Sequence, residues 1–502
     1  MSQILKKGIY NIIFGAIGQL ITLSLGIVIP RLFIVHLGSA ANGLLSSIGQ
    51  ILSYLVLLEA GLGAASVQAL YKPIVKEDRE TINAILSSTH KYFKSTGLIY
   101  ALVVIVLSLL YPLAVDDFPY FVTFTVVILS GIPGVVNYYY TGKFKVLLQA
   151  EGKSYIINNI TTLVYVLSSS IKILIVSLGL GIISIQVSFC IISIIQLLIY
   201  YIIFARKYKW VNFHKPNNDI YLKKRTSVLI HQISSLVLTN GPVIILTFFA
   251  GLKTVSVFVI YSMIFDVIST TLLTISNGIS HIFANLYHKN KDLFVFAYDL
   301  YECLFICISG SLLATAFLFI PSFIQLYTSG VSDTLYNVPY LALVFTIFKF
   351  LACTRTPSLN IINVVGNFKE TQNSAVIEAA LSIIASILFV LMFGIVGVII
   401  GNILALAYRV CYLLLYTNTK ILNRNIFIPF IYILFTGCGF LLITHLFQNE
   451  NVYNSYFELV IHAIKYTIII LPVSTILSFT INTLMTKSFY VLLKLRFTNN
   501  NN

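Results

Sequence analysis

The sequence predicts an all-α polytopic membrane protein with about fourteen transmembrane helices, arranged as two pseudo-symmetric six-helix lobes and two C-terminal helices. Three observations support this fold class: the composition, the distribution of basic residues and a faint internal repeat. Of the 502 residues, 58% are hydrophobic and only 10% are charged, and the mean hydropathy is +0.92. This composition is far from that of a soluble globular protein.

Apolar runs that are long enough to cross a hydrocarbon core of about 30 Å recur along the whole chain. We expect spans near 9–36, 41–71, 92–115, 119–142, 155–178, 181–205, 227–250, 254–284, 300–326, 334–361, 375–393, 396–418, 426–447 and 462–485. The expected organisation is an N-terminal lobe (1–204), a cytoplasmic linker (205–226), a second lobe (227–418) and the last two helices with a cytoplasmic tail (419–502).

The basic residues predict that both termini lie in the cytoplasm. The net charge is +15, and 26 of the 32 Lys and Arg residues fall at the termini or in alternate loops. Only Lys253 and Lys465 fall in the opposite loops. Because cytoplasmic loops retain Lys and Arg during insertion, this alternation requires an even number of spans. The basic excess is therefore explained by topology, and we expect no nucleic-acid partner.

A repeat with an offset of 214 or 215 residues relates the two lobes. Gly152 and Gly179 in the first lobe correspond to Gly366 and Gly394 in the second. Each copy holds six spans, so both copies begin in the cytoplasm and share one orientation. Their pseudo-two-fold axis is then expected along the membrane normal, as in transporters built from parallel repeats.

Polar residues follow one face of several predicted spans. Candidates for binding a ligand are Asn158 and Tyr165 in one span and Thr356 and Asn360 in another. Such a face must meet other helices or water, because lipid cannot solvate it. Two alternatives remain at this point, namely helix–helix contacts and the lining of a cavity.

Six charged residues fall well inside the predicted spans: Arg31, Glu59, Lys172, Asp266, Lys349 and Arg409. A lone charge in this position costs at least roughly 2.5–3.5 kcal/mol. These residues either form buried ion pairs or line an aqueous cavity, and the excess of cations favours an anionic ligand.

Three of these residues have further alternatives. Glu59 and Asp266 either carry H⁺ or Na⁺ as a coupling ion or balance the cationic residues. Arg31 follows Pro30, which can kink the helix. It therefore lies either in a helix that bends as a cavity opens or at the outer interface, to which its side chain snorkels.

Motifs of known catalytic and metal sites are absent from the sequence. It contains no P-loop, GxSxG or HExxH pattern, no CxxC pair and no cluster of histidines. We therefore expect no catalytic residue, no metal and no organic cofactor.

The N-terminal hundred residues carry a recognisable pattern. It consists of Arg31, HLG at 36–38, NGLL at 42–45, EAGLGAAS at 59–66 and KPIVKEDRETI at 72–82. This pattern resembles polysaccharide biosynthesis flippases of the Wzx type. They are grouped in the multidrug/oligosaccharidyl-lipid/polysaccharide (MOP) exporter superfamily with the multidrug MATE exporters and the lipid II flippases.

The resemblance implies two lobes around a cavity that opens alternately to each side of the bacterial inner membrane. The implied substrate is an undecaprenyl-diphosphate-linked oligosaccharide, moved to the outer leaflet for O-antigen of lipopolysaccharide, capsule or exopolysaccharide synthesis. Its diphosphate contact would fall on Arg31, Lys172, Lys349 and Arg409, and the last two helices would accommodate the lipid tail. Membrane lipids, a polysaccharide polymerase and a chain-length regulator are the implied partners.

Three alternatives remain. A MATE-like, cation-coupled multidrug exporter fits less well, because such exporters favour cationic drugs and commonly end after twelve spans. A lipid II flippase is the second alternative. A polysaccharide polymerase or ligase would be an enzyme with a substantial outward loop, whereas the outward loops predicted here are short.

Overall fold

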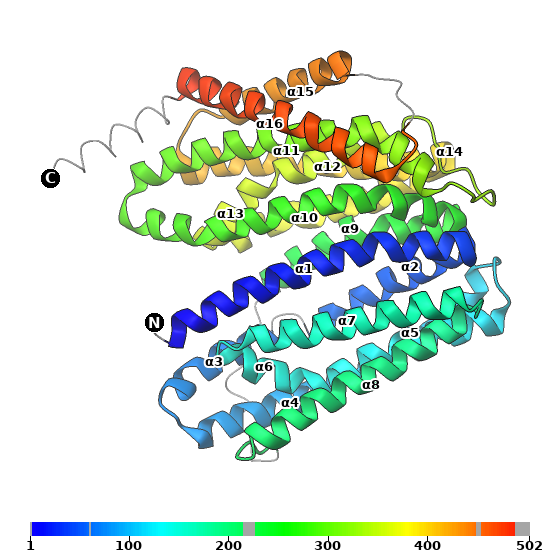
Figure 1. Cartoon of the computed structure of the whole chain (residues 1–502). Helices are drawn as coiled ribbons and strands as arrows, with labels where there is room; N and C mark the ends of the chain where they lie inside the picture. The colour runs from blue at the N-terminus through cyan, green and yellow to red at the C-terminus, as the bar shows by residue number, and fades with distance from the viewer. Residues whose placement is uncertain (1–2, 60–61, 214–225, 448–452, 487–502) are drawn as a thin grey trace. The chain divides into compact units, whose positions relative to one another are not determined.

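The computed structural model describes residues 3–59, 62–213, 226–447 and 453–486, which are almost entirely helical and contain no strand (Figure 1). Within these ranges, thirteen helices are long and apolar enough to cross a membrane. The prediction of an all-α polytopic membrane protein is confirmed.

The longest of these helices contains two crossings. Helix α14, Phe368–Tyr416, has 49 residues, whereas one crossing needs about 20. Its backbone breaks at Gly394, which has a φ of 55°. Ser386 donates to the carbonyl oxygen of Val398 at 3.0 Å, and Ser382 donates to Asn402 at 2.5 Å, so the two halves lie antiparallel. The thirteen candidates therefore hold fourteen crossing segments, the number that the sequence predicts.

The chain divides into two compact units. Unit 1 comprises Met1–Ile233 and Gly251–Ser256, and unit 2 comprises Ser234–Ala250 and Val257–Asn502. Most of the predicted linker (214–225) and most of the predicted tail (487–502) lie outside the described residues.

The helices of unit 1 occupy its sequence with short connections. They are α1 (Gln3–His36), α2 (Ser39–Ser53), η1 (Tyr54–Leu58), α3 (Leu62–Val75), α4 (Arg79–Leu110), η2 (Tyr111–Ala114), α5 (Tyr120–Val136), η3 (Asn137–Thr141), α6 (Gly142–Ala150), α7 (Ser154–Ser177) and α8 (Ile182–Lys207).

Helices α1 and α7 pack in parallel, as expected of the first and fifth spans. Near their N-terminal ends, Asn11 accepts a hydrogen bond from the backbone N–H of Tyr155 at 2.6 Å. Two turns further along α1, a Cβ atom on Gly18 would lie only 2.5 Å from the Thr162 hydroxyl oxygen. A glycine at this position lets the two helices approach closely.

Two irregular turns interrupt the helices of unit 1. The single span predicted at 41–71 is divided, because the 3₁₀ turn η1 follows α2 and α3 begins only at Leu62. The π-helical segment η3 separates α5 from α6. Turns of both kinds are frequent at functional positions in helices.

Unit 2 is built from nine further elements. They are α9 (Thr226–Phe249), α10 (Leu252–Lys289), α11 (Lys291–Tyr327), α12 (Leu341–Thr354), α13 (Thr356–Val365), α14, η5 (Thr417–Leu422), α15 (Phe427–Phe447) and α16 (Tyr456–Met485), with the first residues of α9 and α10 assigned to unit 1.

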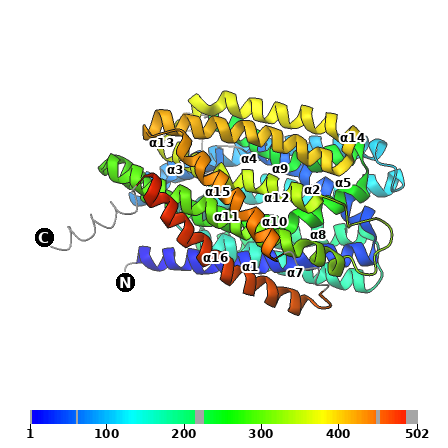
Figure 2. The same cartoon turned by 90° about the horizontal axis from the view of Figure 1, so that it is seen from above.

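Helix α11 is the centre of unit 2. It packs against α12, α15 and α16, which lie along its length in both views (Figures 1 and 2). Consequently 72% of its most apolar window is buried, a larger share than in any other candidate span of the described residues. A Cβ atom on Gly310 would lie 2.1 Å from the methyl carbon of Thr436, so α15 passes directly over this glycine.

Candidate functional site

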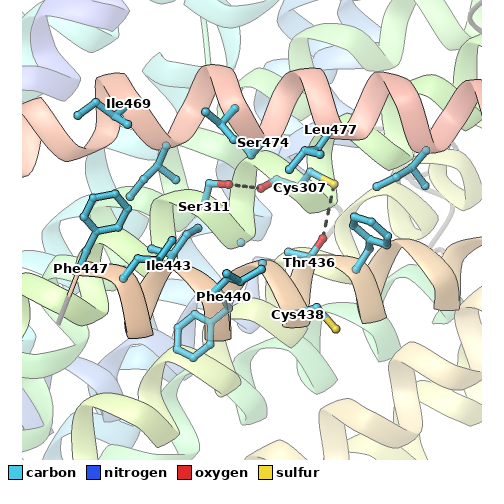
Figure 3. A pocket seen from close by; sticks show the side chains of 18 residues that line it. Cys307, Ser311, Thr436, Cys438, Phe440, Ile443, Phe447, Ile469, Ser474 and Leu477 are labelled. Atoms are coloured by element: carbon cyan, nitrogen blue, oxygen red, sulfur yellow. Dashed lines mark hydrogen bonds between the residues drawn. The ribbon is translucent and has the colours of Figure 1, made fainter.

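Helices α11, α15 and α16 of unit 2 enclose an apolar cavity of about 450 Å³ (Figure 3). This volume lies within the usual range of small-molecule sites, roughly 300–1,000 Å³. None of its described lining residues is charged. They are Cys307, Gly310, Ser311, Phe435, Thr436, Cys438, Gly439, Phe440, Leu442, Ile443, Leu446, Phe447, Ile469, Ile470, Val473, Ser474, Leu477 and Ile481.

The hydroxyl groups at the cavity wall all have hydrogen-bond partners close by. The Ser311 hydroxyl donates to the carbonyl oxygen of Cys307 at 2.8 Å, and the Cys307 thiol lies 3.5 Å from the Thr436 hydroxyl (Figure 3). Since these groups are satisfied locally, the cavity presents mainly hydrocarbon to an occupant. Its chemistry suits an aliphatic chain and offers no polar group to orient a charged drug.

Gly439 of α15 leaves open space at the cavity wall. An added Cβ on Gly439 would meet no atom within 4 Å, although this residue lines the cavity. Gly437, two residues earlier, is equally open but lines an adjoining pocket of about 130 Å³, which shares Gly310, Thr436 and Phe440 with the cavity. The two glycines therefore face different spaces from one helix.

The predicted charges of unit 2 are paired. Lys349 on α12 forms an ion pair with Asp266 on α10 at 2.5 Å, with 12% of the lysine side chain and 51% of the aspartate side chain exposed. The pair therefore has access to the space around the unit. This geometry fits either alternative, a structural ion pair or a site that exchanges partners with a ligand.

Arg409 lies in a closed position. It is 1% exposed, lies 3.3 Å from the Glu378 carboxylate and donates to the carbonyl oxygen of Thr371 at 3.1 Å and to the Ser374 hydroxyl. Arg355 binds the other oxygen of Glu378 at 2.5 Å. Of the two alternatives open for Arg409, the buried ion pair describes what the structure shows.

The predicted polar stripe of α12 and α13 also has internal partners. Asn360 donates to the carbonyl oxygen of Ser276 at 2.8 Å and to its hydroxyl at 2.9 Å, and it accepts from Ser280. Thr356 donates to the carbonyl oxygen of Ala352, one turn back, at 3.2 Å. The Asn360 contacts join α13 to α10 and stabilise the packing of the unit.

The predicted cations of unit 1 are half-buried. Lys172 on α7 lies over the Phe189 ring of α8, with 5.1 Å between its Nζ and the ring centroid. Arg31 lies on α1 directly after Pro30. Two polar candidates lie on α7, where Asn158 faces Gly15 of α1 and Tyr165 is half-buried.

Glu59 interacts electrostatically with Lys145. The lysine Nζ donates to the side-chain oxygen of Asn137 at 2.5 Å, and Asn137 is the first residue of the π segment η3. Gly63 leaves room for the Glu59 carboxylate, since a Cβ atom there would lie 2.6 Å from it. An acid of the predicted second span thus lies beside an irregular helical segment, and its partner Lys145 lies between the spans predicted at 119–142 and 155–178.

A second buried ionic cluster contains residues that the sequence did not identify as candidates. Arg424, between η5 and α15, binds both Asp299 and Glu302 on α11, which are 1% and 0% exposed. Burial opposes the charge, yet the carboxylates of Glu302 and Asp299 raise the pKa of Arg424. Asp299 also accepts from Tyr432 on α15 at 3.1 Å and from Asn482 on α16 at 2.6 Å.

Two of the acids that were not predicted lie inside apolar spans, as the predicted charged residues do. Glu302 and Glu378 lie inside the spans predicted at 300–326 and 375–393, so their position in an apolar run was a usable signal. Arg424 and Lys145 gave no such signal, because they lie at span ends where basic residues are ordinary.

Comparisons with known proteins find the same architecture in solved structures. No family model matches the sequence, and no curated protein matches it significantly. Solved structures do match. The lipid II flippase MurJ in an inward closed conformation has a TM-score of 0.67 and 16% identity, over 92% of this chain and 98% of that one.

Multidrug transporters match as well. An inward-facing MATE family transporter of the MOP superfamily has a TM-score of 0.63 and 15% identity, over 84% of this chain and 96% of that one. A MATE in the bent conformation has a TM-score of 0.53 and 14% identity, over 86% and 95%. The chain shares the fold of these solved MATE and MurJ structures. At these identities the likeness shows the fold alone.

Proposed function

We propose that this protein is a flippase that translocates undecaprenyl-diphosphate-linked oligosaccharide repeat units from the inner to the outer leaflet of the bacterial inner membrane. Transport would proceed by alternating access and serve O-antigen, capsule or exopolysaccharide synthesis. A polysaccharide polymerase and a chain-length regulator are the proposed partners, since they would consume the exported units.

The observation that carries this proposal is the apolar cavity between α11, α15 and α16. A polyprenyl chain is a long hydrocarbon, and this cavity offers hydrocarbon walls without a charge. Helices α15 and α16 lie outside the two predicted six-span copies, and these two additional helices form most of the cavity wall. The match to the flippase also spans 92% of the chain, against 84% for the inward-facing MATE transporter.

The proposed contact to the diphosphate uses Arg31, Lys172 and Lys349. Each retains some exposure in its own unit, whereas Arg409 is excluded from the proposal by its burial against Glu378. Asp266 would compete with a diphosphate for Lys349, because the two are in direct contact. H⁺ or Na⁺ coupling at Glu59 or Asp266 remains part of the proposal.

A MATE-like multidrug exporter is the second candidate, favoured by the fold match at a TM-score of 0.63. A lipid II flippase is the third, favoured by the match at 0.67. The three differ in cargo, so a transport assay that supplies each cargo separately distinguishes them.

The decisive experiment is complementation of a strain that lacks its repeat-unit flippase, with lipid-linked units quantified in each leaflet. The test variant is Gly439→Leu, which places an isobutyl group in the cavity. The matched control is Gly437→Leu, on the same helix but facing the smaller pocket. Both replace a helical glycine and gain helix propensity, so their effects on folding should be similar.

We expect the wild-type chain to restore units in the outer leaflet, the Gly437→Leu variant to retain most of this activity and the Gly439→Leu variant to lose most of it. Restoration of drug resistance without flipping would support the MATE-like alternative. Rescue of a strain that lacks its lipid II flippase would support the third candidate.

A further inference from the structure

A second cavity, in unit 1, has a different chemistry. It is a groove of about 660 Å³ between the N-terminal start of α6, the C-terminal end of α8 and the residues that follow α8. Its lining combines aromatic, aliphatic and basic side chains. They are Tyr140, Lys143, Phe144, Leu197, Leu198, Tyr201, Phe204, Ala205, Tyr208, Lys209, Val211 and Phe213.

One wall of the groove continues onto a face of α8 that meets lipid. Leu198 and Tyr201 line the groove and are 52% and 62% exposed. Ile194 and Ile202 extend this exposed apolar stripe along the same helix. In a membrane-spanning helix such a stripe lies against acyl chains, so the groove opens sideways into the bilayer. Its tyrosines lie at the end of the span, where aromatic residues meet the headgroup layer.

The opposite wall is the segment that follows α8, and α4 fixes it in place. Asn83 donates to the carbonyl oxygen of Trp210 at 3.3 Å and accepts from the backbone N–H of Asn212 at 2.9 Å. The guanidinium carbon of Arg79 lies 5.4 Å from the centroid of the Trp210 ring. This wall therefore has a defined position beside the groove.

The two lysines of the groove provide an unbalanced positive charge. The Nζ of Lys143 lies 4.4 Å from the centroid of the Phe213 ring and 5.3 Å from that of Phe144. Within the part of the chain that the structure describes, neither Lys143 nor Lys209 has a carboxylate partner or a hydrogen-bond acceptor. Glu151, which directly follows α6, is bound by Lys153 and the Tyr208 hydroxyl.

We propose that this groove binds an anionic phospholipid of the surrounding membrane. Its phosphodiester contacts Lys143 and Lys209, and one acyl chain follows Leu198 and Tyr201 along α8. Basic pockets between membrane helices at the cytoplasmic side bind such headgroups, and each lysine near an anionic surface contributes about 1 kcal/mol. The proposal uses residues of unit 1 alone and does not depend on the transported cargo.

The chain carries its own probe for this site. Trp210 is the single tryptophan, and it lies between the groove residues Lys209 and Val211. The full-length protein is placed in nanodiscs that contain brominated phosphatidylglycerol or brominated phosphatidylcholine, and quenching of Trp210 fluorescence is measured against lipid mole fraction.

We expect half-maximal quenching at a several-fold lower mole fraction of phosphatidylglycerol than of phosphatidylcholine. Lys143→Gln and Lys209→Gln should each raise the phosphatidylglycerol value about fivefold and leave the phosphatidylcholine value unchanged. Lys143→Arg should retain the preference. Lys207→Gln is the matched control, because Lys207 is exposed at the end of α8 and does not line the groove.

A second variant tests the groove without changing charge. Ala205→Phe fills it and should reduce quenching by both lipids, with the emission maximum of Trp210 reporting that the wall is intact. Equal quenching by the two lipids, or an equal loss in Lys207→Gln, would overturn the proposal. Relief of quenching by inorganic diphosphate would also overturn it, since the site would then recognise a free anion.

Discussion

The ionic cluster around Arg424 allows a quantitative prediction for the docking of α15 and α16. Replacing Arg424 by Gln removes the cation that pairs with Asp299 and Glu302 within the described residues, and these two side chains are 1% and 0% exposed. Two carboxylates would remain in a buried position, where the removal of one partner of an ion pair costs about 3–5 kcal/mol. The remaining donors among the described residues carry no charge and cannot replace the guanidinium; they are Tyr298, Tyr432, Asn482 and Thr486.

The assay is thermal unfolding of the purified full-length protein in detergent, combined with limited proteolysis. Arg424→Gln should lower the melting temperature and allow cleavage within α15 and α16 at lower temperature. Lys420→Gln, an exposed basic residue on η5, is the control that should behave as wild type.

A charge-neutral triple variant separates the buried charge from lost packing. Combining Arg424→Gln with Asp299→Asn and Glu302→Gln leaves no unpaired charge and should recover most of the lost stability. If Arg424→Gln is as stable as wild type, the carboxylates are not held by this arginine. If the triple variant is as unstable as the single one, the loss arises from packing and the electrostatic reasoning fails.

Three further outcomes are expected from other contacts. Glu378→Gln should destabilise the protein more than removal of either arginine that binds it, since it leaves the buried Arg409 and the partly buried Arg355 without a carboxylate, and thermal unfolding of the three variants gives the order. Burial opposes the charge of Lys153, but its hydrogen bonds to Glu151 and Tyr208 raise the pKa of Lys153. Burial raises the pKa of Tyr208 to about 12. Both groups stabilise the fold at lower pH and lose this contribution as pH rises through the raised values, so above pH of about 10 the wild type should lose stability more steeply than Lys153→Gln. Gly310→Ala should destabilise by about 1–3 kcal/mol through its clash with α15, while Gly437→Ala, in open space, should not; equal melting temperatures would contradict the close approach.

The spans were predictable because each is encoded by a continuous apolar run. The hairpin within α14 was predictable as well, since Gly394 marks the break in an otherwise uninterrupted hydrophobic stretch. The division of the second span was not, because the residues of η1 are as apolar as a helix interior. Helix type within an apolar run depends on tertiary contacts that the run itself does not encode.

The partners of the charged residues could not be predicted from spacing alone. Glu378 binds Arg355, 23 residues earlier in the chain, and Arg409, which lies on the other half of the hairpin. Which faces of two helices meet is decided by packing over their full length. The sequence therefore identified the candidates but left open which of them are enclosed, and the structure encloses Arg409 while it leaves Lys349 and Asp266 partly exposed.

The ionic cluster and the apolar cavity occupy successive stretches of the same three helices. Asp299 and Glu302 lie near the start of α11, whereas Gly310 and Ser311 of the cavity follow further along it. On α15, Tyr432 belongs to the ionic cluster, and residues from 435 onward line the cavity. On α16, Asn482 belongs to the cluster, and residues before it line the cavity. Both helices therefore donate hydrogen bonds to the buried Asp299 at one end, whereas their contacts along the cavity are mainly apolar. Because the apolar part can separate without exposing a buried charge, we expect an occupant of the cavity to widen it at the end remote from Arg424. Docking of α15 and α16 and access to the cavity are thus controlled by different residues, and substitutions at Arg424 and at Gly439 should affect stability and transport separately.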